Sequence, residues 1–499
     1  MNVTAVFVCL TVIVILFRFL HKMKNKRLYE LLEQFPSYPT YPLIGNAHLL
    51  FGAYNDLLLK SEQLLQPHDR LVFWVGPIPC LVLKKYNDIL TMLNQSLDRD
   101  SLHVADEWAG IGLLTAEYEE WKKSRKMLAP AFSSDMLTKY VDVFHEKASN
   151  FVEKLKPVVD TDVEVDVLDY VLNTNLDAIV ENTMGISMES TGKRGEEFCT
   201  ALLDGFISVT ERLLSPWLHP HFIYMLYLRL TGKIESIKRL QYLPSKILRD
   251  NLNDSHNQKI EPDGVDSSRT VIDLLIKRRL KEPGFTETRT RDELLQIILA
   301  GVETTALNMS YLMLMLAIHQ DVQQKVYEEI TQLVSEDETI TAVQLFHQLK
   351  YLDQCIRETT RMYSPVTITG RRTHKECVLK DNTIVPANML VMAVIHLAHH
   401  DPELYRNPNK WDPENFSEEA IAERPKGSCQ LSFGFGPRSC IGARYAMLSV
   451  KTQITHILRN YHLSTHVKEL TNDDLKMDLM IRNKIGYPIK FTSRQKVKV

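Results

Sequence analysis

The sequence lacks the features that would divide a chain of 499 residues into separate units. It has no glycine- and serine-rich linker, no low-complexity tract and no internal repeat, so one large domain is as reasonable as the two to four that length alone suggests. An excess of basic residues is also missing. The formal net charge is −3, which gives no indication of a nucleic-acid partner.

Paired metal-binding residues are missing as well. The seven cysteines are scattered and include no C-x-x-C pair, which fits reduced thiols in the cytosol better than a zinc site or a disulfide framework. His396, His399 and His400 could share one helix face, but no glutamate completes an H-E-x-x-H motif. The Asp401-Pro402 pair follows directly and indicates a turn, so we expect no metal site there.

Charge is absent from the first seventeen residues, which are mostly valine, isoleucine, leucine and phenylalanine. Such a run just spans a bilayer core, which needs about 17–25 residues. Basic residues follow it, so segment 1–20 is predicted to be a single-pass membrane anchor whose C-terminal flank faces the cytosol. A cleaved signal peptide would need a basic start and a small-residue cleavage site, and neither is present.

The rest of the chain predicts a hinge and one large domain. The basic residues and closely spaced prolines of segment 21–45 favour an extended, semi-rigid arm. Segment 46–499 shows no composition break. Its long helix-like segments and short strand-like runs predict a mainly α fold with a small β-sheet (α+β). The helix-like segments are 138–158, 200–216, 290–316, 318–334 and 350–363, and the strand-like runs are 70–83, 376–379, 385–392 and 476–492. We expect the 476–492 tail and the 70–83 run to form the sheet, with 385–392 beside them.

The most informative stretch follows the pattern F-x-x-G-x-R-x-C-x-G, with Phe433, Gly436, Arg438, Cys440 and Gly442 at its defined positions. A lone cysteine in a turn is usually a small hydrophobic residue. A cysteine in a tight, glycine-rich loop instead suits a thiolate bound to haem iron. The glycines let backbone N–H groups approach the sulfur, the arginine can neutralise a haem propionate, and the phenylalanine can shield the sulfur.

A second polar stretch interrupts a long apolar helix at Ala300, Gly301, Glu303, Thr304 and Thr305. Glycine weakens a helix, and paired threonines can bond to carbonyls one turn back and bend it, which opens a slot for a small ligand. Glu303 and Thr304 place a carboxyl group beside a hydroxyl, which suits proton delivery to dioxygen. Taken alone, the same residues are commonly an exposed turn or a cap.

Two further motifs place a pair of hydrogen-bonding or charged side chains at helical spacing. Trp121 and Arg125 lie at i and i+4, so an indole N–H and a guanidinium can both donate to a propionate. The neighbouring lysines leave an ordinary solvated helix as the alternative. Glu358 and Arg361 form an E-x-x-R pair that is either a surface ion pair or, with further hydrogen bonds, a buried one.

These motifs, in this order and spacing, resemble the cytochrome P-450 superfamily of haem-thiolate monooxygenases over nearly all of the chain. The likeness is greatest to insect microsomal members of the family-4 clan. The resemblance implies that Cys440 binds haem b iron and that Glu303 and Thr304 are catalytic. It also implies that haem propionates bind Trp121, Arg125, Arg438 and Arg371, although Arg372 beside Arg371 leaves that last choice open.

The chain departs from the family at two positions. Asn415 stands where a P-E-R-F stretch has the arginine that supports the E-x-x-R pair, so either the Asn415 amide or backbone carbonyls are expected to replace it. Ala300 stands where many family-4 enzymes have a glutamate that bonds covalently to haem, so we predict non-covalent haem.

The resemblance also implies partners and a location. Electrons would come from NADPH through a cytochrome reductase docked near Lys122, Lys123 and Lys126, with cytochrome b5 as a further partner that the resemblance allows. The catalytic domain would lie on the cytosolic face of the endoplasmic reticulum membrane. The substrate would be apolar (a fatty acid, hormone or foreign compound), because Val366 and the helix before Ala300, with Leu294, Ile297 and Ile298, are apolar.

Two other functions stay open on the sequence. A reductase-independent isomerase or dehydratase would use the same fold without a proton relay, which the intact Glu303 and Thr304 pair disfavours. An inactive haem-binding paralogue would tolerate losses at the site, and the ligand and relay positions are all filled.

Overall fold

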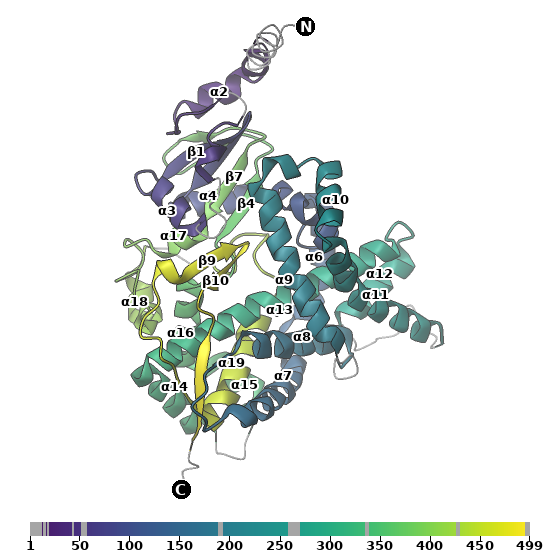
Figure 1. Ribbon diagram of the computed structural model, residues 1–499, viewed down its shortest axis with the longest axis vertical. Helices are drawn as coiled ribbons and strands as arrows, with labels where there is room; N and C mark the ends of the chain where they lie inside the picture. Colours follow the sequence, from purple (N-terminus) through teal and green to yellow (C-terminus); the bar gives the residue numbers. More distant parts are fainter. Residues whose placement is uncertain are drawn as a thin grey trace.

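The protein is mainly helical, with four small sheets among the described residues (Figure 1). The computed structural model describes residues 12, 16, 19–41, 44–50, 57–187, 193–257, 270–334, 339–425 and 430–494. The predicted anchor over 1–20 therefore lies outside the described residues except at four positions. The mainly α fold with small sheets is confirmed.

Each segment predicted to be helical contains a helix. The longer helices are α3 (Leu57–Leu65), α4 (Tyr86–Gln95), α6 (Tyr118–Leu128), α7 (Ser134–Leu155), α8 (Leu168–Met184), α9 (Lys193–Leu214), α10 (His221–Leu230), α11 (Lys233–Asn257), α12 (Val271–Lys281), α13 (Glu287–Ile318), α14 (Gln320–Leu333), α16 (Lys350–Met362) and α19 (Ala443–Asn460). The shorter ones are α2 (Lys26–Leu32), α5 (Asp106–Ala109), α15 (Ala342–His347), α17 (Ile395–His399) and α18 (Glu418–Glu423).

The strands fall into separate small groups. They are β1 (Arg70–Val75), β2 (Ile78–Leu83), β3 (Val165–Asp166), β4 (Ile368–Arg372), β5 (Cys377–Val378), β6 (Ile384–Val385), β7 (Leu390–Val394), β8 (Tyr461–Ser464), β9 (Leu475–Asp478), β10 (Met480–Asn483) and β11 (Pro488–Ser493). The largest sheet has the order β1-β2-β7-β4, with β7 parallel to β2 and the other pairs antiparallel. The predicted pairing of the 70–83 run with the 385–392 region is thus confirmed.

The predicted place of the C-terminal tail in that sheet is wrong. β9 and β10 form a hairpin of their own, while β11 pairs with β8 and β3. Ile489 and Phe491 pack into the large core of α7, α13 and α19, whereas the main sheet covers a second core. Because β8 leaves the C-terminal end of α19 at that large core, it provides the nearest free edge for β11.

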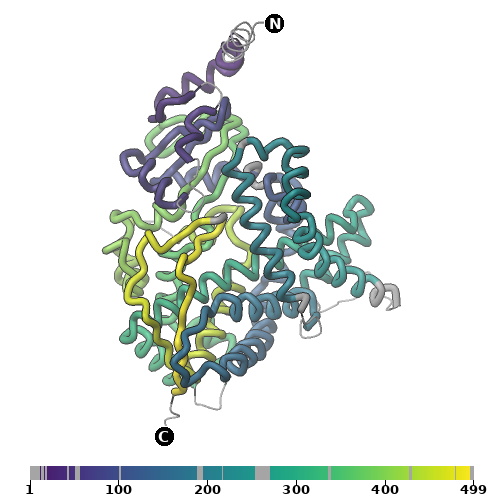
Figure 2. The backbone as a smooth tube through the Cα atoms, in the orientation of Figure 1, coloured from purple at the N-terminus to yellow at the C-terminus, as the bar shows by residue number. Residues whose placement is uncertain are grey.

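Helix α13 is the central element of the molecule, as the tube in Figure 2 shows. Thr286 caps its start by accepting a hydrogen bond from the Arg289 N–H at 3.2 Å. It is also the one described helix that is long and apolar enough to cross a membrane, but 78% of its most apolar window is buried inside the protein. It packs against α8, α11, α16 and α19, so it is the core helix on which the site is built.

The described part of the hinge runs along the edge of β1. The Val72 N–H donates to the Pro36 carbonyl at 2.8 Å, and the Asn46 side chain bonds to both Tyr38 and Trp74. Gly45 has a φ of +65°, and a side chain there would meet the Trp74 carbonyl. Between this segment and the β1–β2 turn lies a cavity of about 650 Å³, lined by Phe19, His21, Lys22, Tyr29, Ser37, Tyr38, Pro39, Thr40, Trp74, Gly76 and Pro77.

Candidate active site around Cys440

Cys440 lies in a tightly closed loop immediately before α19. The Cys440 N–H donates to the Phe433 carbonyl at 2.8 Å, and the Ser439 N–H donates to the Gly436 carbonyl at 3.0 Å. Gly434 and Gly436 both have φ near +70°, where glycine is strongly favoured. A side chain at Gly436 would also stand only 3.1 Å from the Leu93 carbonyl, so the loop closes against the end of α4.

The Cys440 thiol lies beside the start of α19 and close enough to Arg99 and Arg125 to feel their charges. The side chain keeps accessible surface, yet burial is the main influence on its pKa and raises it. The sulfur is thus surrounded by protein atoms and still accessible. The Gly442 N–H, Arg125 and Arg99 act in the opposite direction and favour the thiolate, and the adjacent N-terminus of α19 favours it too. The surroundings therefore suit a thiolate that binds a metal.

One face of α13 also keeps accessible surface in the middle of an otherwise buried helix. Ala300 is exposed and Thr304, one turn later, is half-buried, while Val302 between them is buried. The Thr304 hydroxyl donates to the Ala300 carbonyl at 2.6 Å, which is the back-bonding predicted from the paired threonines. Gly301 has a packing reason, because a side chain there would meet Ile179 of α8 at 2.9 Å.

Glu303 lies away from that face. Its side chain is completely buried and forms an ion pair with Arg482 of β10. Successive residues of a helix are about 100° apart, so Glu303 and Thr304 point in different directions although they are neighbours in sequence. The structure thus places the hydroxyl at the accessible face and the carboxylate behind it.

Arg438 and Arg371 are buried without a carboxylate partner. Arg438 donates to the Ala116 carbonyl at 2.9 Å and lies 4.3 Å from the Trp121 ring, while its Nε and Nη1 have no hydrogen-bond partner. Arg371 donates to the Thr369 hydroxyl and the Gly370 carbonyl, and its Nε has none. Neither guanidinium has an ion pair in the described part of the chain.

Arg99 joins them, and the sequence did not mark it. It donates to the Arg438 carbonyl at 3.1 Å, and its Nε lacks a partner. An arginine between Asp98 and Asp100 looks like solvated surface, so no pattern identifies it. It reaches the site because the backbone of Asp98 pairs with that of Arg372, next to Arg371.

The guanidinium groups destabilise one another's charge. Burial lowers the pKa of Arg371 to about 8, and the charges of Arg99 and Arg438 add to the effect. Burial and the charge of Arg99 lower the pKa of Arg438 to about 9. The pKa of Arg99 falls to about 10, mainly through burial. Burial also lowers the pKa of Arg125, which Cys440 partly offsets. A dianionic ligand beside Cys440 would relieve this repulsion, so the residues fit the two propionates of a haem.

The structure separates Arg371 from Arg372. Arg371 is almost fully buried and feels Arg99 and Arg438, whereas Arg372 donates to the Asn388 carbonyl on an exposed side. Trp121 lies under Arg438, and Arg125 lies near Cys440. Phe433 is half-buried and holds the loop through its carbonyl.

The apolar residues that were expected beside the site divide into two groups. Leu294, Ile297 and Ile298, from which the sequence argued for an apolar substrate, are packed in the core. Val366 is half-buried and keeps accessible surface. Helical periodicity identified these residues as apolar but could not tell which side of α13 faces open space.

Arg361 and Glu358 form the centre of a buried hydrogen-bond network, which contacts the segments that precede Cys440. Arg361 makes two hydrogen bonds of 2.8 Å to Glu358 and donates to the carbonyls of His399, Pro408 and Lys410. Glu358 also accepts from the Asp412 N–H at 2.9 Å and from the Asn415 amide at 3.0 Å. Both replacements proposed for the missing arginine, the Asn415 amide and backbone carbonyls, are therefore present.

The histidines near residue 400 serve this network. The ring of His399 bonds through Nδ1 to the Arg361 carbonyl and through Nε2 to the Leu431 N–H, so it ties α16 to the loop before Cys440. His400 bonds to the His396 carbonyl at 2.8 Å. Burial lowers the pKa of His399 to about 3 and that of His400 to about 4, which keeps both rings neutral.

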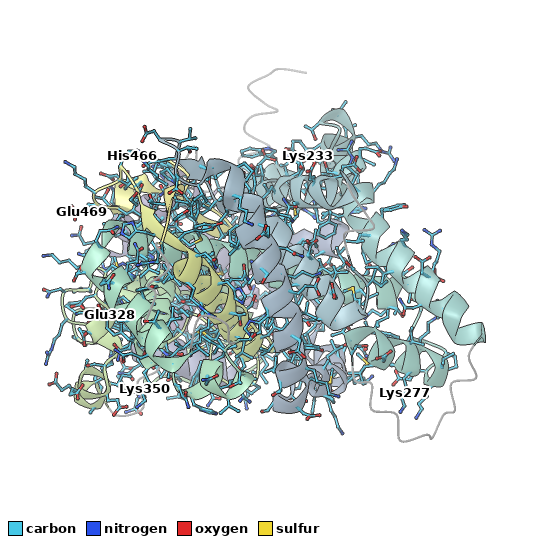
Figure 3. The ribbon with its side chains drawn as sticks, turned by 90° about the horizontal axis from the view of Figure 1, so that it is seen from below. Lys233, Lys277, Glu328, Lys350, His466 and Glu469 are labelled. Carbon is cyan, nitrogen blue, oxygen red and sulfur yellow. The ribbon has the colours of Figure 1, made fainter. Side chains whose placement is uncertain are left out.

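The three lysines of α6 lie at the surface. Lys122 and Lys126 on α6 are exposed, and Lys123 pairs with Glu120 at 2.7 Å. Figure 3 likewise shows the labelled Lys277, Glu328 and Glu469 at the outer rim of the molecule. The buried arginines beside Cys440 are thus distinct from the solvated charges that cover the protein.

Comparison with known proteins identifies the family. The cytochrome P450 family model matches residues 36–491. Cytochrome P450 4c21 of Blattella germanica is 26% identical, with 98% of this chain and 99% of that protein covered. Cytochrome P450 4d1 of Drosophila simulans is 25% identical, with 96% of each covered, and cytochrome P450 4V2 of Homo sapiens is 25% identical, with 91% and 88% covered. The resemblance to insect family-4 members is confirmed, and the chain belongs to the cytochrome P450 family as a haem-thiolate monooxygenase.

Proposed function

We propose that the protein holds a non-covalent haem b between Cys440 and α13 and oxygenates an apolar substrate with electrons from NADPH through a membrane-bound reductase. The observation that carries the cofactor site is a set of buried arginines near Cys440 that, among the described residues, form no ion pair and keep N–H groups without a hydrogen-bond partner. Arg371, Arg438 and Arg99 would bind the propionates, with Trp121 and Arg125 completing the site. Ala300 offers no carboxylate for a covalent bond to haem.

The chain's own residues divide the remaining work. When bound, haem supplies the oxygen-activating chemistry, and a thiolate ligand increases electron density at the iron. Thr304 would hold a proton at the accessible face of α13, because its hydroxyl is already oriented by the Ala300 carbonyl. Glu303 would act as a deeper acid kept in place by Arg482. The hydrophobic surroundings of α13 would exclude water and favour an apolar substrate.

Membrane attachment has support at two places. The predicted anchor over 1–20 leads into the described hinge, and the cavity there combines aromatic side chains with Lys22. Helix α10 exposes Phe222, Leu226 and Leu230, which are spaced four residues apart and form one apolar stripe. Both lie in the upper half of Figure 1. We therefore propose a single-pass protein whose catalytic domain lies on the cytosolic face of the endoplasmic reticulum membrane.

The cofactor proposal is tested by the difference spectrum of the reduced, carbon monoxide-bound protein. A strongly red-shifted Soret band is expected for the wild type and not for Cys440→Ala. Cys80→Ala is the matched control, because Cys80 is buried in the main sheet. A wild-type band typical of histidine ligation in undenatured protein would overturn the assignment of Cys440.

The proton role of Thr304 is tested by Thr304→Ala. We expect the fraction of electrons that reaches product to fall about tenfold, since general acid catalysis contributes about 10²–10⁴-fold and water partly substitutes. Thr305→Ala is the control, because Thr305 is buried away from the accessible face. Full coupling in Thr304→Ala would refute the role. Product formation without NADPH and reductase would favour an isomerase or dehydratase.

A further inference from the structure

A second arginine, Arg424, lies next to Asn415, which stands where the family has an arginine. Arg424 comes nine positions later and donates a hydrogen bond to the Asn415 carbonyl. Its guanidinium lies 4.4 Å from the Tyr405 ring and 4.7 Å from the Phe416 ring. Arg361 lies 4.8 Å from the same Tyr405 ring. Both arginines therefore meet at one tyrosine beside the network of Glu358.

The fold explains how a later residue can return to this point. Helix α18 begins after Ser417, whose hydroxyl accepts from the Ala420 N–H at 3.2 Å, and ends where the Arg424 N–H donates to the Ile421 carbonyl. The short helix turns the chain back on itself. Arg424 is half-buried there, whereas the nearby Arg406 is exposed and pairs with Glu423 at the surface.

The charges support the same assignment. Asn415 gives Glu358 a hydrogen bond at 3.0 Å but no positive charge. Burial lowers the pKa of the Arg424 guanidinium, and Tyr405 and Glu358 partly offset that effect. A half-buried guanidinium that contacts the Asn415 carbonyl thus brings a positive charge near the network of Glu358 and Arg361.

The network has a direct connection to the cysteine loop. His399 binds the Leu431 N–H, Gln430 donates to the Arg357 carbonyl at 2.8 Å, and Ser432 donates to the Thr360 carbonyl at 2.9 Å. These three contacts anchor residues 430–432 to the C-terminal end of α16. Phe433 follows immediately and accepts the hydrogen bond of the Cys440 N–H.

We propose that Arg424 supplies the guanidinium that Asn415 cannot, and so acts as a positioning residue for the Cys440 thiolate. On this proposal, Arg424 takes the role of the motif arginine from a position nine residues later in the chain. The inference rests on Cys440 as the thiolate ligand, which the wild-type spectrum tests separately.

The test moves the arginine from position 424 to position 415. The full-length variants are Arg424→Ala, Arg424→Lys, Asn415→Arg and the double variant Asn415→Arg with Arg424→Ala. Arg406→Ala is the matched control, because it removes an exposed arginine from the same segment. The readouts are the lifetime of the thiolate band in the carbon monoxide spectrum at raised temperature and the midpoint of thermal unfolding by circular dichroism.

We expect Arg424→Ala to shorten the lifetime of the thiolate band about tenfold, the ratio that corresponds to losing about 1.4 kcal/mol. Arg424→Lys should fall between Arg424→Ala and the wild type, because lysine keeps the charge but loses the planar fork. The double variant should return to within about threefold of the wild type, and Arg406→Ala should leave the lifetime unchanged.

Two results would overturn the proposal. One is an Arg424→Ala protein that behaves like Arg406→Ala, and the other is a double variant no better than Arg424→Ala alone. If Arg424→Ala retains no haem, a loaded double variant still supports the exchange, and an unloaded one refutes it. If the wild type lacks the thiolate band, Cys440 ligation fails, and the unfolding midpoints alone decide whether the arginines are exchangeable.

Discussion

Among the described residues near Cys440, two groups of buried arginines differ in how their charges are satisfied. Arg361 directs its guanidinium at Glu358 and three backbone carbonyls, so the protein itself completes its hydrogen bonds. Arg371 and Arg438 keep N–H groups without partners, and the charge of Arg99 acts against the charges of both. A buried cation without a partner is costly, so the second group indicates where an external anion belongs.

The largest expected effect comes from removing Arg361, whose hydrogen bonds the protein itself completes. Arg361→Ala should lower the free energy of unfolding by about 3–5 kcal/mol, because it leaves Glu358 as an unpaired buried charge. Chemical denaturation followed by circular dichroism measures this in haem-free protein. Arg357→Ala is the control, since Arg357 pairs with Asp353 at the surface. A loss below about 1 kcal/mol for Arg361→Ala would mean that the network is not needed for folding.

Removing a charge from the second group, Arg371 and Arg438, should stabilise the haem-free protein instead of destabilising it. Arg371→Gln is expected to stabilise haem-free protein by about 1 kcal/mol, because it removes an uncompensated buried charge. The same change should speed haem release about tenfold by removing a charge-assisted hydrogen bond. Transfer of haem to a scavenger protein measures the release.

Arg372→Gln is the matched control for that experiment. Arg372 donates to the Asn388 carbonyl on an exposed side, so its loss should change neither property much. Destabilisation of haem-free protein by Arg371→Gln, equal to that caused by Arg361→Ala, would remove the distinction between the two groups.

Low pH should destabilise the folded protein through His399 and His400, which lie beside Arg361. Folded His399 and His400 have pKa values of about 3 and about 4, well below the value of about 6.5 for an unfolded histidine. The unfolded chain therefore binds more protons between these limits. The free energy of unfolding should fall as the pH drops below about 6.5 and continue to fall towards about 3.

Denaturation series at several pH values measure that slope. His399→Gln should flatten the slope by about one proton although the variant is less stable overall. His347→Gln is the control, because His347 is exposed. An unchanged slope in His399→Gln would contradict a neutral, hydrogen-bonded ring at that position.

The smallest effect is expected from cations outside both groups. Lys126→Ala should leave stability and haem binding unchanged, because Lys126 is exposed. If the reductase docks on α6, the apparent affinity for reductase should fall a few-fold at low salt and the difference should vanish at high salt. A salt-independent loss would point to a structural role for Lys126.

Much of this arrangement could be predicted from local patterns. The loop around Cys440 carries its own glycines, and the periodicity of 290–316 follows a helix that is apolar almost all round. The E-x-x-R pair lies one helical turn apart, so its contact required no knowledge of the fold. The mistakes concern longer-range choices. The tail was assigned to the wrong sheet, and the apolar character of Leu294, Ile297 and Ile298 was taken to describe the substrate although these side chains lie in the core.

The sequence by itself determined the helices, the cysteine loop, the paired Glu358 and Arg361, and membership in the family, because these depend on residues close together in the chain. Only the tertiary structure decided which arginines lie together near Cys440. Arg99 joins Arg371 because the backbones of Asp98 and Arg372 pair, and Arg424 reaches Asn415 because α18 reverses the chain. Burial and the mutual repulsion of charges are properties of the packed molecule, so no spacing within the sequence could have shown them.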